Sequence, residues 1–129
     1  MALRIALDTN RYTDYVTGIA AGQDAVVRAA EVYLPFVVLA ELRGGYRLGK
    51  RCQENERVLA EFLRTPRVQV LFADEHTTHV YAELYADLRR AGTPIPTSDL
   101  WIAALAIQHD LALFSRDRHF DAVPRLPRN

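Results

Sequence analysis

The chain has 129 residues, of which 50% are hydrophobic and 25% charged, and its 16 basic side chains balance 16 acidic ones. This composition favours one folded domain over residues 1–129 and excludes both a disordered chain and a strongly cationic nucleic-acid-binding coat. The lone Cys52 and the charged start MALRIALD argue against a disulfide scaffold and a signal peptide, and no apolar run approaches the roughly 20 residues that span a bilayer, so we expect a cytoplasmic protein without membrane segments.

Short runs rich in β-forming residues alternate along the chain with longer helical patterns. In chain order they predict a strand at 3–8, helices at about 10–17 and 23–31, a strand at 32–36, helices at 37–49 and 51–64, a strand at 68–72, a helix at about 75–91, a helix containing 100–107 and a strand at 111–115. Gly92 is suited to end the helix before it, and Thr97 or Ser98 is expected to cap the helix after it. Strands separated by helices imply parallel pairing through right-handed crossovers. The sequence therefore predicts an α/β fold, a three-layer α/β/α sandwich around a central, mostly parallel sheet.

Four carboxylates are expected to meet at the carboxyl edge of this sheet, where ligands bind in such folds. Asp8 ends the first strand, Asp117 lies just beyond the fourth, Glu41 is on the helix entered from the second, and Asp99 opens the helix that feeds the fourth. Taken singly, each has a structural explanation, since an aspartate often caps a helix or sits in a turn. Their common placement at one edge favours a functional cluster.

Such a cluster needs a counter-charge. Two carboxylates about 5 Å apart repel by roughly 3 kcal/mol at an effective dielectric constant near 20, so four together cannot all stay ionised unaided. Because the candidate donors are oxygen atoms, Mg²⁺ or Mn²⁺ fits better than Zn²⁺. Carboxylate-held Mg²⁺ also binds phosphate oxygens, which points to phosphodiester hydrolysis. Both RNA and DNA contain such bonds, so either could be the substrate.

Four segments together resemble PIN-domain nucleases, particularly the small VapC-type toxins of bacterial toxin–antitoxin pairs. They are ALDTN (6–10), VLAELRGG (38–45), GTPIPTSDLWIAALA (92–106) and LALFSRDRHFDAV (111–123). The resemblance implies that Asp8, Glu41, Asp99 and Asp117 form the acidic metal and catalytic site. It also implies that Asn10 and Ser115 are supporting polar groups. Two positions depart from the usual pattern, since Ser115 stands where threonine is common and the charged Arg11 where an apolar residue is usual.

The same resemblance implies an activity and partners. The expected activity is Mg²⁺- or Mn²⁺-dependent endonuclease action on RNA, in which a metal-activated water attacks the phosphorus. The expected partners are the RNA substrate, a second copy of the chain in a homodimer, and a small antitoxin whose helix fills a groove. The residues that could line this groove are Tyr12, Tyr15, Val16 and Tyr46, of which the first three could equally belong to the core.

Several basic residues flank the acidic motifs. Arg43 follows Glu41 on its helix, and Arg116 and Arg118 flank Asp117, so these arginines are candidates for phosphate contacts or simple solvated charges. Arg47 and His119 have the same two interpretations.

Two other functions compete with the nuclease. A phosphatase of the haloacid-dehalogenase type also starts from an aspartate ending the first strand. It needs a second aspartate where this chain has Asn10, and a catalytic lysine, whereas Lys50 follows no strand. A catalytically silent PIN-like scaffold that only binds RNA or protein is the other alternative, and the presence of all four acids argues against it.

Overall fold

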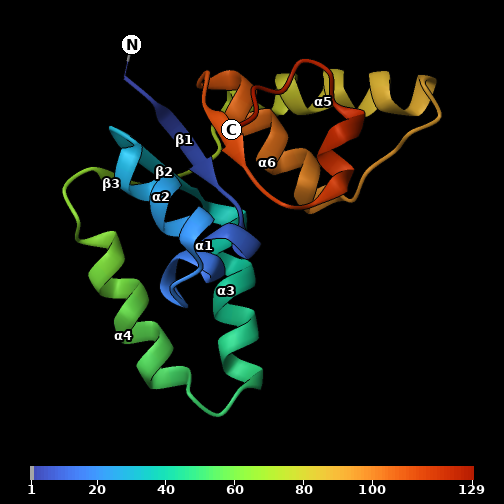
Figure 1. Cartoon of the computed structure of the whole chain (residues 1–129). Helices are drawn as coiled ribbons and strands as arrows, with labels where there is room; N and C mark the ends of the chain where they lie inside the picture. Colours follow the sequence, from blue (N-terminus) through green and yellow to red (C-terminus); the bar gives the residue numbers. More distant parts are fainter. Residues whose placement is uncertain (1) are drawn as a thin grey trace.

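A computed structural model describes residues 2–129 (Figure 1). Its elements are β1 (Arg4–Leu7), α1 (Thr9–Val16), α2 (Ala20–Arg28), β2 (Glu31–Pro35), α3 (Phe36–Leu48), α4 (Cys52–Leu63), β3 (Val68–Leu71), α5 (Glu75–Arg90), α6 (Thr97–Gln108), β4 (Ala112–Phe114) and a 3-10 helix, η1 (Arg118–Ala122). All four predicted strands are present, and each predicted helix has a counterpart.

The four strands form one parallel sheet in the order β3-β2-β1-β4. Ala6 at the centre of β1 pairs with Tyr33 on one side and Leu113 on the other. Ile5, Ala6 and Leu7 are all 0% exposed, because β1 lies between two strands and under helices on both faces. Helices α5 and α6 pack together on one side of the sheet, and α1 to α4 gather on the opposite side (Figure 1). The predicted three-layer α/β/α arrangement is confirmed.

In helices α5 and α6, the buried residues follow the apolar pattern of the sequence. In α5, Val80, Leu84 and Leu88 are buried at helical spacing, and Gly92 follows the helix with a φ of +77°, a left-handed conformation suited to glycine. The apolar helix α6 is covered on most sides, and its residues 102–106 are fully buried. These two helices carry Asp99 to the sheet edge.

Two predicted helix starts are wrong. Neither Thr97 nor Ser98 caps α6, because Pro96 is extended and its carbonyl already accepts a hydrogen bond from the backbone N–H of Leu100 at 3.0 Å. The helix therefore begins at Thr97, and its N-cap has no side-chain hydrogen bond. Helix α2 lies about three residues earlier than predicted, since the backbone becomes extended at Ala29 to enter β2. Within residues 2–129, the structure has no helix that is both long and apolar enough to cross a membrane.

Candidate metal and active site

Asp8 lies at the point where β1 becomes α1. It is the N-cap of α1, accepting a hydrogen bond from the Thr9 backbone N–H at 2.8 Å, and it is only 5% exposed. The Ser115 hydroxyl donates to Asp8 Oδ2 from the end of β4. Burial raises the pKa of the Asp8 carboxyl, and the charge of Asp117 raises it further, although the hydrogen bonds from Ser115 and Thr9 oppose this. Asp8 is therefore both a helix cap and a desolvated acid.

Asp99 lies in the first turn of α6 and is 8% exposed. Its Oδ2 lies 2.8 Å from Nδ1 of His119. Burial is the main cause that raises the pKa of Asp99; the His119 hydrogen bond lowers it, and the charges of Asp117 and Asp8 raise it. Asp8 and Asp99 come from different elements, yet the charge of Asp117 raises the pKa of both.

The other two predicted acids come from η1 and α3. Asp117 is the N-cap of η1 and accepts a hydrogen bond from the His119 backbone N–H at 2.9 Å. Glu41 on α3 is an exposed residue, yet burial of its carboxyl raises its pKa, and the charges of Asp8, Asp99 and Asp117 add to this. Among residues 2–129, ligand atoms lie within 4.8 Å of one another only for Asp99, Asp117 and His119, while the charges of Asp8, Asp99 and Asp117 reach Glu41.

Asn10 and Ser115 form a polar network behind Asp8. The Asn10 side-chain amide lies 3.4 Å from both Asp8 Oδ2 and Ser115 Oγ. Ser115 Oγ also accepts a hydrogen bond from the Asp117 backbone N–H at 3.0 Å. One hydroxyl therefore links the Asp8 carboxylate to the Asp117 backbone.

His119 belongs to the cluster, although the sequence suggested only a phosphate contact or a solvated charge. Its Nδ1 lies 3.1 Å from Asp117 Oδ1 as well as 2.8 Å from Asp99 Oδ2. One potential ligand atom from each of these three residues lies within 4.8 Å of the others. The available signal was the aspartate two residues before His119 in SRDRHF, because an aspartate side chain often accepts a hydrogen bond from the backbone N–H two residues on, as Asp117 does from His119, and this turn keeps the two residues close.

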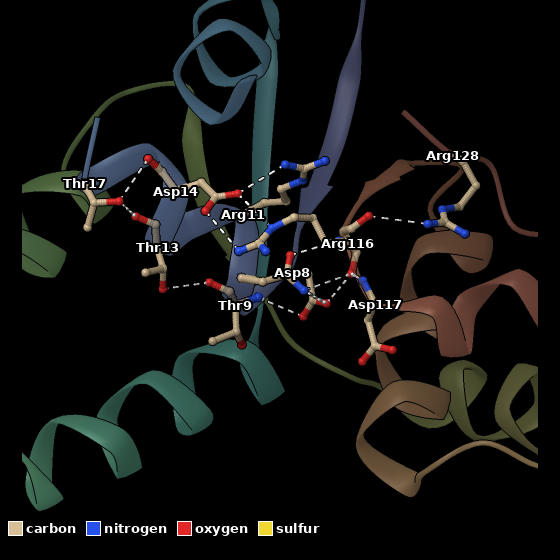
Figure 2. Close-up of polar contacts among 11 residues, drawn as sticks. Asp8, Thr9, Arg11, Thr13, Asp14, Thr17, Arg116, Asp117 and Arg128 are labelled. Atoms are coloured by element: carbon tan, nitrogen blue, oxygen red, sulfur yellow. Dashed lines mark hydrogen bonds and ion pairs between the residues drawn. The ribbon is translucent and has the colours of Figure 1, made fainter. Parts of the chain in front are cut away.

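Two of the three arginines expected to contact phosphate are paired with acids. Arg116 makes a two-point contact with Asp14, from Nε at 3.0 Å and from Nη2 at 3.1 Å (Figure 2). Arg43 contacts Glu56 on α4 at 3.2 Å. Arg118 is exposed. Asp14, buried on α1, was missed because nothing in its local sequence indicates the distant arginine.

The donor set fits a hard divalent cation. Carboxylates are the ligands that Mg²⁺ and Mn²⁺ prefer, and one imidazole beside them is compatible with Mn²⁺. Three of the carboxyls, those of Asp8, Glu41 and Asp99, have raised pKa values because of burial and mutual repulsion. A bound cation would relieve both effects.

Comparison with known proteins identifies the family of this chain. Residues 5–126 match the family model described as PIN domain. Ribonuclease VapC4 of Mycobacterium tuberculosis is 33% identical over 88 residues, which is 68% of each chain, and Toxin FitB of Neisseria gonorrhoeae is 31% identical over 88% of this chain and 87% of its own. A chain in the crystal structure of VapBC2 from Rickettsia felis, bound to a DNA fragment from their promoter, superposes with a TM-score of 0.82 at 25% identity and covers 97% of this chain and 96% of that one. The chain therefore belongs to the PIN-domain family and has VapC ribonucleases among its relatives.

Proposed function

We propose that this protein is an endoribonuclease that hydrolyses RNA phosphodiester bonds with the help of Mg²⁺ or Mn²⁺. The observation that carries the proposal is the acidic cluster at the carboxyl edge of the sheet, where Asp99 and Asp117 lie with His119, Ser115 joins the Asp8 carboxylate to the Asp117 backbone, and the charges of these acids raise the pKa of Glu41. RNA is the proposed substrate because a relative that matches 68% of the chain is named a ribonuclease.

The four carboxylates would hold the cation, and the chain itself orients them. A divalent cation in such a site supplies Lewis acidity and a more acidic water as nucleophile. Ser115 and Asn10 fix the direction of the Asp8 carboxylate, and Ser115 also holds the backbone of Asp117. Burial of Asp8 and Asp99 keeps bulk water away, which strengthens any interaction with a charged ligand. Arg43 and Arg118 remain predicted phosphate contacts.

Cleavage of a labelled, structured RNA tests the proposal. The purified protein should cleave it in Mg²⁺ or Mn²⁺ and not in EDTA, and Asp8→Ala and Asp99→Ala should abolish cleavage while circular dichroism shows a folded protein. Asp24→Ala is the matched control, because Asp24 is exposed and pairs with the equally exposed Arg28. Full activity in EDTA, or unchanged rates in both site variants, would contradict the proposal.

We further propose that the protein is the toxin of a toxin–antitoxin pair and binds a small antitoxin. The names Toxin FitB and VapBC2 support this role. A groove of about 230 Å³ between α1 and α4 offers a place for a partner helix, and its lining includes Tyr15, Val16, Val58 and Phe62. Tyr12 does not line this groove, because it is 1% exposed in the core, which corrects the expectation for that residue.

The partner proposals have separate tests. Toxicity on expression should be relieved by co-expression of the gene next to this one, and expression that is harmless without any partner would contradict the antitoxin role. We also propose a homodimer, which light scattering at micromolar concentration would detect as twice the 14.6 kDa chain mass. A monomer in that measurement would contradict it.

A further inference from the structure

Asp14 on α1 has a buried carboxylate that binds Arg116, in the loop after β4. It is 7% exposed, and both of its oxygens accept hydrogen bonds from Arg116, at 3.0 and 3.1 Å (Figure 2). A second guanidinium, that of Arg11, approaches Asp14 Oδ2 at 3.2 Å. A two-point contact to a buried carboxylate is strong and directional, in contrast to the single exposed ion pairs elsewhere on the surface.

Asp14 is packed closely on two sides. A Cβ atom placed on Gly22 would lie 2.9 Å from Asp14 Cβ and 2.8 Å from the Tyr15 backbone nitrogen, so the α2 backbone packs directly against Asp14. On the other side, the Arg11 guanidinium lies over the Phe114 ring at 4.5 Å. Asp14 therefore has little freedom to follow a displaced arginine.

The other end of the contact is part of the site. Arg116 stands between Ser115 and Asp117, and its backbone N–H donates to Asn10 Oδ1 at 3.0 Å. Ser115 in turn donates to Asp8 and accepts from the backbone of Asp117. A shift of the Arg116 backbone would therefore move the groups that orient Asp8 and Asp117 together.

We propose that Asp14 is a positioning residue for the metal site, acting through Arg116 to hold Ser115 and Asp117 in register with Asp8. This inference rests on the proposed function, since it assigns a role toward that site. It also gives Arg116 a role other than phosphate contact, because the guanidinium is held by Asp14 and the residue acts through its backbone. Loss of such outer support typically costs 10- to 100-fold in metal affinity or activity.

The test compares Asp14→Asn, Arg116→Lys and the double variant with wild type. The measurements are the Mn²⁺ dissociation constant, from the electron paramagnetic resonance signal of free Mn²⁺, and kcat and KM for a labelled RNA. Each single variant should weaken Mn²⁺ binding and lower kcat by roughly 10- to 100-fold while KM for RNA stays within about threefold. The double variant should be no worse than the more severe single one, because both changes break one contact. Asp24→Asn, at an exposed ion pair, should match wild type.

The outcomes separate the possible roles. Unchanged Mn²⁺ affinity and kcat in both single variants overturns the inference, as does a rise in KM alone for Arg116→Lys, which would make Arg116 a phosphate contact. A purely structural ion pair would lower the melting temperature and leave Mn²⁺ affinity unchanged. If Asp14→Asn does not fold, Arg116→Met decides, since the Arg116 side chain is 54% exposed and its replacement leaves the core intact. Failure of wild type to bind Mn²⁺ or to cleave RNA would instead reject the proposed function.

Discussion

Asp99→Asn should make the metal-free protein more stable. Asparagine keeps the shape of aspartate and removes a charge from the acidic cluster, where burial, Asp117 and Asp8 all raise the pKa of Asp99. When folding raises the pKa of a carboxyl, keeping that carboxyl ionised at neutral pH lowers the free energy of unfolding. The clustered charges thus lower the stability of the metal-free protein, as is common at functional sites.

The distance between the acids sets the magnitude. Carboxylate oxygens of Asp99 and Asp117 lie within 4.8 Å of each other. At that distance and an effective dielectric constant of 20, two unit charges repel by about 3.5 kcal/mol. Asp117 is 33% exposed, so solvent weakens the repulsion, and we expect a net gain of roughly 1–2 kcal/mol, or about 4–7 °C in melting temperature for a chain of this size.

His119 makes the effect depend on pH. The pKa of His119 is raised, first by its hydrogen bond to Asp99 and also by the charge of Asp117. A histidine whose pKa is raised by folding stabilises the native state while its imidazole is protonated. This stabilisation is fully present below the pKa of the unfolded chain and is lost as the pH rises through the pKa of the folded protein. Wild type therefore keeps more of this contribution at pH 6 than at pH 9. The advantage of Asp99→Asn should therefore be larger at pH 9 than at pH 6.

Thermal melts in EDTA at pH 6 and pH 9 measure the effect, with Asp24→Asn as the control on an exposed ion pair. A second series with Mn²⁺ should stabilise wild type more than Asp99→Asn, because a ligand that binds only the native state raises its apparent stability. A variant clearly less stable than wild type at pH 9 in EDTA, with the same response to Mn²⁺, would refute the reasoning. Asp99 would then be a structural acid that the helix dipole favours at the start of α6.

Three further predictions concern stability. Burial raises the pKa of Asp8, so its ionisation penalty disappears as pH falls through that pKa. In EDTA, the stability advantage of Asp8→Asn over wild type in urea melts should shrink as pH falls from neutral toward the ordinary aspartate pKa of about 3.9, and a constant difference would contradict this. Gly22→Ala should cost about 1–3 kcal/mol because its Cβ would meet backbone at 2.8 Å, whereas Gly45→Ala, with open space around it in α3, should gain about 0.5–1 kcal/mol; equal melting temperatures would contradict both. Thr77→Val should cost about 1–3 kcal/mol, because the buried Thr77 hydroxyl completes the capping box of α5 and donates to Gln108 at 2.6 Å, and a stability equal to that of the exposed control Thr78→Val would disprove it.

Local patterns accounted for most of the fold. Helix α5 shows the repeat of Val80, Leu84 and Leu88 that its burial confirms, and the apolar run in α6 predicted its coverage. The start of α6 was wrong because hydroxyl residues near a helix start suggest a cap, while the extended Pro96 already supplied the first helical hydrogen-bond acceptor. Such one-residue shifts depend on backbone geometry that the sequence does not show.

The sequence by itself determined the parallel α/β class and predicted that the candidate carboxylates lie at one edge of the sheet. Alternating strands and helices force parallel pairing, and parallel pairing places every strand end, with Asp8 and Asp117 just beyond two of them, at one edge. Only the tertiary structure decided which side chains complete the site. Asp14 and Arg116 are 102 positions apart, and His119 reaches Asp99 across 20. These contacts depend on how α1, α6 and the loop after β4 pack together, and no local spacing encodes that packing.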